Sequence, residues 1–175
     1  MRRDQLAHLI RAAADISGET RIIVIGSQAI LGSLSEDRLP ARAWLSLEAD
    51  LVLAQAPKGE AVESLLGADS QFSITHGIWV DVVGNETAAL PRGWRRRLIP
   101  LVGFDTGQAT ALCLERHDLV ISKLVAGRDK DLEFTRALLE AKLLSPTTLR
   151  NRARFIDGAS IEAAERVRAW VAAHA

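Results

Sequence analysis

Hydrophobic residues recur at two different spacings along the first two thirds of the chain. Residues 3–16 place apolar side chains three and four positions apart, which predicts an amphipathic helix that ends at Ser17-Gly18. Short apolar runs follow, and runs of this length are typical of strands with little solvent exposure. The strands predicted in this way span residues 21–25, 45–54, 72–74, 78–83, 98–104 and 109–114, with short helices at 28–34 and 60–66.

The last third of the chain has helical spacing throughout. Asp118 is a favourable N-cap for a helix that Gly127 interrupts, and a second helix is predicted to follow. Ser145 with Pro146 directly after it is typical of another helix start, and Ser160 is predicted to cap a final helix.

The order of these elements predicts an α/β fold of the α+β kind, with a mixed β-sheet, flanking helices and a helical C-terminal part. We place a soft boundary near Glu115, which divides the chain into a core of residues 1–115 and a helical part of residues 116–175. A chain of 175 residues is long enough for one compact domain, or for one domain with a helical appendage.

The charge balance argues against one broad class of protein. Lys and Arg total 22, as do Asp and Glu, so the net charge is zero and a globally basic nucleic-acid binder is not indicated. The single cysteine, Cys113, cannot form an internal disulfide, which suits a reducing compartment. No apolar run approaches the ~20 residues that a membrane span needs, and the N-terminus lacks a signal-peptide core. We therefore expect a cytoplasmic protein that has no membrane partner.

Three acidic residues stand inside apolar strand segments. Glu48 and Asp50 are two positions apart, so they share one face of a strand, where they repel each other and lose hydration. Asp81 lies in a later apolar run. Carboxylates of this kind are hard oxygen ligands for Mg²⁺, with Mn²⁺ as an alternative, and they predict a two-metal phosphoryl-transfer site. The competing interpretation is a pair of solvent-facing acids on an edge strand and one acid that caps a loop.

Gly26 and Ser27 follow the first predicted strand and precede a predicted helix. A glycine lets the backbone approach a phosphate closely, and the free N–H groups at a helix start attract anions. The hydroxyl of Ser27 adds one more donor. The turn is therefore a candidate nucleotide-binding segment, although a simple tight turn would have the same sequence.

A charged segment surrounds the helix break at Gly127. Lys123 precedes the break and could hold a triphosphate as a point charge, and Arg128 follows it and could grip phosphate oxygens in pairs. Asp131 could act as a general base or orient the lysine. The alternative is a solvated charged turn between two helices.

Two clusters of arginine complete the candidate features. Both could contact RNA phosphates, although charge runs are more often solvated faces. Trp94, within the first cluster, could stack on a base or anchor the core. The clusters comprise Arg92, Arg95, Arg96 and Arg97, and then Arg150, Arg152 and Arg154.

Taken together, these features resemble the DNA polymerase β-like nucleotidyltransferase superfamily. Its pattern is a Gly-Ser turn, two acids that flank one residue, and a third acid on a later strand. The stretch 118–134, which includes S-K-L-V-A-G-R-D-K-D-L-E-F, resembles the Lys and Arg-x-Lys-Asp motifs of AbiEii-type nucleotidyltransferases. Proteins of that type occur as toxins of bacterial toxin–antitoxin and phage-defence systems. The resemblance covers roughly residues 20 to 144.

The resemblance implies a role for each matching residue. Ser27 would contact the triphosphate, and Lys123 would bind a nucleotide phosphate. The acid pair would hold Mg²⁺, Asp81 would be the third acid of the centre, and Asp131 would be the catalytic acid of the last motif. The first acid, Glu48, stands where the family usually has Asp.

We therefore expect a metal-dependent enzyme that moves a nucleoside monophosphate from an NTP to a hydroxyl group. The arginine clusters favour an RNA acceptor, in particular the end of a tRNA, and a protein hydroxyl is the second choice. A toxin role with a cognate antitoxin protein as partner is a further expectation. Two alternatives stay open: a catalytically degraded fold that binds nucleotides or a partner, and a plain structural subunit.

Overall fold

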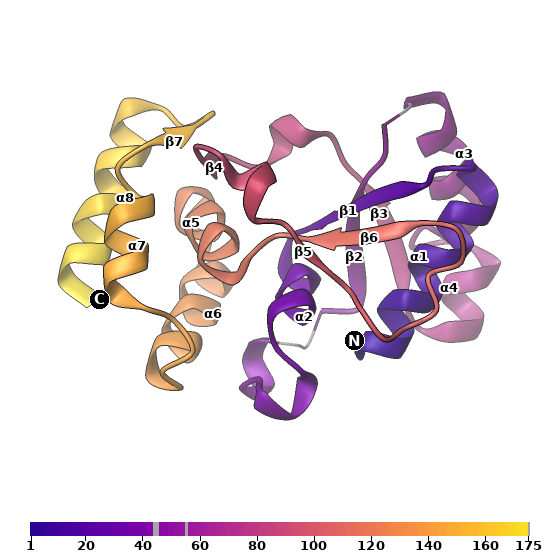
Figure 1. Ribbon diagram of the computed structural model, residues 1–175, viewed down its shortest axis with the longest axis horizontal. Coiled ribbons are helices and arrows are strands. Elements are labelled where there is room, and N and C mark those ends of the chain that lie inside the picture. The colour runs from indigo at the N-terminus through magenta and orange to yellow at the C-terminus, as the bar shows by residue number, and fades with distance from the viewer. Residues whose placement is uncertain (44–45, 55, 175) are drawn as a thin grey trace.

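A five-stranded mixed sheet forms the centre of the molecule (Figure 1). The computed structural model describes residues 1–43, 46–54 and 56–174, so the predicted strand start at Leu45 lies outside the described residues. The strand order is β3-β2-β1-β6-β5, and a separate two-stranded ribbon joins β4 to β7. The strands are β1 (Arg21–Ile25), β2 (Glu48–Val52), β3 (Trp79–Val82), β4 (Leu90–Pro91), β5 (Ile99–Pro100), β6 (Thr110–Cys113) and β7 (Ile156–Asp157).

Both kinds of strand pairing occur in this sheet. Strand β1 pairs antiparallel with β2 and parallel with β6, and β2 pairs parallel with β3. Strand β5 pairs antiparallel with β6 at the far edge. The predicted fold class, a mixed sheet with flanking helices and a helical C-terminal part, is therefore confirmed.

Apart from the short helix that follows the Gly-Ser turn, the helices from the first half of the chain gather on one side of the sheet in Figure 1. Helix α1 (Arg3–Ser17) packs against α3 (Ala56–Leu66), and α3 packs against β3 and against α4 (Gln71–His76). A 3₁₀ turn at Ser27–Ala29 leads into the short α2 (Ile30–Ser33).

The strand predicted at residues 72–74 is wrong, because these residues lie in helix α4. The side chain of Ser70 accepts a hydrogen bond from the Ser73 N–H and caps the helix start, while Gly77 ends the helix in a left-handed conformation. A run of three apolar residues is too short for its spacing to distinguish the two structures, and here the caps decide.

Four helices make up the C-terminal part: α5 (Arg116–Ala126), α6 (Asp129–Glu140), α7 (Pro146–Arg152) and α8 (Ile161–His174). Helix α5 packs against the other three and against β4. The domain division near Glu115 stays a prediction. Among the helices of the described residues, none has the length and apolar composition needed to cross a membrane.

The predicted N-cap at Asp118 is wrong. Glu115 caps α5, and its side chain accepts a hydrogen bond from the His117 N–H. Asp118 lies within the first turn of the helix and is 0% exposed. It forms ion pairs with Arg97 and Arg152, which reach it from two other segments. An acid at this position therefore links three segments of the chain rather than starting the helix.

Candidate functional site

The three predicted acids project from one face of the sheet. In the parallel pairing of β2 with β3, Asp50 lies directly opposite Asp81, and Glu48 lies opposite Trp79. Residues that face each other across a strand pair, and residues two apart on one strand, point to the same side. The register therefore brings together Glu48, Asp50 and Asp81 although Asp81 is distant in the sequence.

The Gly-Ser turn lies at the end of the neighbouring strand. Ile25, the last residue of β1, is opposite Asp50 in the antiparallel pairing, so the turn begins beside that acid. Gly26 has φ 62° and ψ −165°, a combination that is essentially confined to glycine. The side chain of Asp50 packs against this glycine. The turn and the acid pair therefore belong to one site.

The surroundings of Asp50 penalise its negative charge. Burial raises the pKa of its carboxyl from the usual 3.8 to about 6, with repulsion from Glu48 and then Asp81 as further causes. The positive charge of Lys123 acts in the opposite direction. A cation placed between these carboxylates would relieve the repulsion.

Lys123 joins the helical part to the Gly-Ser turn. Its Nζ donates hydrogen bonds to Ser27 Oγ and to Asp131 Oδ1, each at 2.9 Å. The side chain is 8% exposed, and Nζ lies 4.6 Å from the centre of the Phe134 ring. This ammonium group is therefore held at a fixed point beside the turn.

Asp131 is held on both of its carboxylate oxygens. Lys123 donates to one oxygen, and Arg128 Nε donates to the other at 2.6 Å. The residue is 0% exposed, and although burial raises the pKa of its carboxyl, hydrogen bonds from Arg128 and Lys123 hold that pKa below its usual value. Of the two roles considered for Asp131, this geometry fits the orientation of Lys123 better than proton uptake.

A cavity of about 410 Å³ opens between the sheet and helix α5. Gly26, Asp50, Lys123 and Arg128 line it, together with a wall formed by residues 86–89. Ser27 lines an adjoining cavity of about 300 Å³ with Lys123, so the lysine borders both spaces. The predicted nucleotide-binding residues therefore surround one contiguous region.

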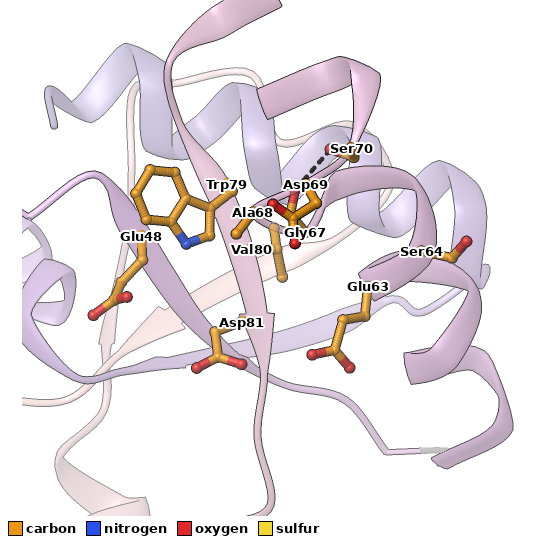
Figure 2. A pocket seen from close by; sticks show the side chains of 10 residues that line it. All are labelled: Glu48, Glu63, Ser64, Gly67, Ala68, Asp69, Ser70, Trp79, Val80 and Asp81. Carbon is orange, nitrogen blue, oxygen red and sulfur yellow. Dashed lines mark hydrogen bonds between the residues drawn. The ribbon is translucent and has the colours of Figure 1, made fainter. Parts of the chain in front are cut away.

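A second cavity, of about 610 Å³, lies on the other side of the acids (Figure 2). Glu48 and Asp81 enter it from neighbouring strands, Glu63 approaches from α3, and Trp79 contributes its indole ring. Asp69 is a fourth acid, and no Lys or Arg occurs among the described residues that line this space. The sequence did not indicate the contribution of Glu63 and Asp69, since α3 reaches the site only through its packing on β3.

The acids provide a suitable donor set for Mg²⁺, but their side chains are not drawn together. In the described parts of the chain, no three or more His, Cys, Asp or Glu side chains are grouped closely enough to hold a metal ion. Glu48, Asp50 and Asp81 nevertheless offer carboxylate oxygens from adjacent strands on one face. An ion bound by all three acids would require these side chains to adopt other rotamers.

The two arginine clusters divide into half-buried and exposed members. Arg97 and Arg152 donate to Asp118, and Arg152 also pairs with Glu115. Trp94 is buried and anchors the core, which was one of its two predicted roles. The arginines that stay exposed are Arg92, Arg95, Arg96, Arg150 and Arg154.

Comparison with known families adds a finding that is independent of this geometry. A family model described as a nucleotidyltransferase of unknown function (DUF6036) matches residues 4–173. The search among curated proteins found no match, and the search among solved structures also found none. The family match spans the sheet, the acids and the helical part alike.

Proposed function

The chain belongs to this nucleotidyltransferase family, and we propose that it moves a nucleoside monophosphate from an NTP to a hydroxyl group of an RNA acceptor, with Mg²⁺ as cofactor. One observation supports this function above the others. Lys123, whose ammonium group donates hydrogen bonds to Ser27 and Asp131, lines the same cavity as Asp50. A phosphate-binding cation and the central acid of the predicted metal site thus face one space of suitable size for a nucleotide.

The triphosphate would lie along the Gly-Ser turn and the buried lysine. Gly26 gives the backbone room to approach phosphate oxygens, and Ser27 offers its hydroxyl. Lys123 supplies a fixed positive charge. Arg128 uses Nε to bind Asp131, and its side chain is 61% exposed, so its remaining N–H groups are accessible to a phosphate.

Glu48, Asp50 and Asp81 would hold Mg²⁺, with Mn²⁺ as an alternative, and the bound ion would supply charge stabilisation for phosphoryl transfer. In the transfer, an acceptor hydroxyl oxygen forms a bond to the α-phosphorus while the bond from that phosphorus to the pyrophosphate oxygen breaks. Asp81, which faces the neighbouring cavity, would accept the hydroxyl proton. Asp131 would keep Lys123 in position.

The site residues indicate the acceptor less directly than they indicate the nucleotide. Exposed arginines near the site favour RNA, and a tRNA-like end is the acceptor that we propose first, with a protein hydroxyl second. The resemblance to AbiEii-type enzymes further supports a toxin role with a cognate antitoxin protein as partner. Growth arrest on expression, rescued by a neighbouring gene, would test that role separately.

A labelling assay tests the proposed transfer. Wild type and an Asp50→Asn variant would be incubated with each α-³²P-labelled NTP, Mg²⁺ and total RNA. We expect a labelled RNA band with the wild type only. Asp15→Asn, which removes an exposed acid on α1, is the matched control and should label RNA like the wild type. A labelled protein band would instead identify a protein hydroxyl as the acceptor.

A degraded fold that only binds nucleotides is the second candidate. Glu48 in place of the usual Asp favours it, as does the absence of a close three-acid cluster within the described residues. In that case Mg²⁺ and NTP would together raise the melting temperature, yet no acceptor would be labelled. Transfer that is lost in Asp50→Asn would exclude this candidate.

A further inference from the structure

Two arginine segments that are far apart in the sequence meet on one surface. The Arg92 N–H donates a hydrogen bond to the Phe155 carbonyl oxygen at 2.9 Å. Below that contact, Arg97 and Arg152 converge on the buried Asp118. The inner arginines therefore hold the two segments together, and the exposed arginines of both segments adjoin this junction along the chain.

The outer side of this surface combines positive charge with an exposed aromatic ring. Phe155 is 61% exposed, and the Arg92 guanidinium carbon lies 5.5 Å from the centre of its ring. Asp157 is the acid that pairs with Arg92, at 3.5 Å, and both side chains are exposed. We call the surface around this junction the arginine face, and we define it by Phe155 and the exposed arginines that adjoin the two segments, which are Arg92, Arg95, Arg96, Arg150 and Arg154.

The arginine face and the nucleotide cavity lie at the two ends of one β-ribbon. Ala89 and Gly158, which lie against each other, line the cavity at the first end. The paired strands β4 and β7 then lead to Arg92 and Phe155 at the second end. Three strand steps separate the ends, or about 10 Å at ~3.3 Å for each residue. Figure 1 shows β4 and β7 close together beside the C-terminal helices, above α5 in this view.

We propose that the arginine face binds the single-stranded end of the RNA acceptor, so that its terminal hydroxyl reaches the acids along the β4–β7 ribbon. This inference rests on the proposed function and assigns its acceptor site. The arginines would contact successive phosphates, and an unpaired base would stack on Phe155.

The charges of the neighbouring surfaces support an RNA strand at this position. The net charge of the whole chain is zero, so a polyanion would be attracted only by a local positive surface. The second cavity, which Glu48, Glu63, Asp69 and Asp81 line, would repel phosphates. A single strand is favoured over a duplex because the ring of Phe155 can stack only on a base that is not already paired.

The test measures RNA binding without NTP, so it does not depend on catalysis. A short fluorescein-labelled single-stranded RNA is titrated with wild type and with Arg92→Gln/Arg95→Gln/Arg96→Gln, and its anisotropy is followed at several salt concentrations. Each lost phosphate contact lowers the slope of log K against log salt by about 0.7, so the triple variant should lose about 2 from that slope. The charge-matched control is Arg21→Gln/Arg38→Gln/Arg136→Gln, at exposed positions that line none of the cavities described, and its slope should equal that of the wild type.

Phe155→Ala tests the stacking contact separately. Loss of one stacked base should weaken binding about 5- to 150-fold without changing the salt slope. Equal RNA affinity in wild type, the Arg92/Arg95/Arg96 variant and Phe155→Ala would overturn the proposal. Mg²⁺-dependent NTP binding, followed by thermal shift in the same variants, separates this failure from failure of the proposed function. The arginine variants should keep NTP binding, and Asp50→Asn should lose it while RNA binding persists.

Discussion

The carboxylate of Asp50 occupies the space in which any other residue at position 26 would place its side chain. A β-carbon built on Gly26 would lie 1.8 Å from Asp50 Oδ2, far inside contact distance. Asp50 is also the acid whose charge is opposed most clearly by burial and by Glu48. The geometry of the turn and the position of the central acid therefore depend on each other.

Gly26→Ala should disturb both stability and transfer. The backbone conformation at Gly26 costs a residue with a side chain about 1–3 kcal/mol, and Asp50 must also move. Gly77→Ala is the matched control, because Gly77 has φ 67° with nothing within 4 Å of a built β-carbon, and left-handed strain there should cost about 1–2 kcal/mol. Urea denaturation measures the two free energies of unfolding. This account would be contradicted if the two variants lost the same free energy of unfolding and Gly26→Ala kept full transfer.

The spacing of the acids allowed part of this site to be predicted from sequence alone. Glu48 and Asp50 are two residues apart in an apolar run, and the period of a strand makes them neighbours on one face. Their approach to Asp81 depends on the pairing of β2 with β3, which is nonlocal and leaves no local signal. The resemblance to a known pattern, rather than periodicity, linked the third acid to the pair.

Asp118 shows why local sequence patterns could not predict the contacts that depend on the tertiary fold. An acid before an apolar helical run suits an N-cap, and it suits a buried ion pair equally well. The choice depends on Arg97 and Arg152, which approach from segments whose positions only the tertiary fold determines. Phe155 is a similar case, because its exposure follows from the end of α7 and the start of β7.

Asp50 should make stability depend on pH. The folded protein ionises this carboxyl near pH 6, whereas the unfolded chain ionises it near the usual 3.8, so the folded state binds the extra proton between these values. Asp50 should therefore contribute a fall of up to about 3 kcal/mol in the free energy of unfolding as the pH rises from about 4 to about 6, and this contribution should stay lost above that. Denaturation in EDTA at several pH values measures it.

The comparison with Asp50→Asn isolates this contribution. The variant cannot ionise at position 50, so the difference between its stability and that of the wild type should grow across the same pH range. Mg²⁺ added above pH 6 should stabilise the wild type and leave the variant unchanged, since the ion would relieve the repulsion. A constant difference at all pH values would show that Asp50 titrates normally.

Asp118→Asn should destabilise the protein far more than the loss of a helix cap. Asn caps a helix about as well as Asp, so the substitution would cost little at an N-cap, whereas removal of the acid from a buried ion pair costs about 3–5 kcal/mol. The larger value is expected because Arg97 and Arg152 would lose their shared partner. Guanidinium denaturation measures the change. A loss close to zero would instead fit the capping role that the sequence suggested.

Asp131→Asn should separate the structural role of this acid from its role in transfer. The substitution leaves Lys123 buried without its counter-ion and should cost about 3–5 kcal/mol. The double variant Lys123→Met/Asp131→Asn removes both charges and should recover much of that stability, yet it should not label RNA because the phosphate-binding charge is gone. Asp129→Asn, at an exposed position in the first turn of the same helix, should cost at most about 1 kcal/mol and keep full transfer. Transfer by the double variant would show that Lys123 does not bind the nucleotide, whatever its effect on stability.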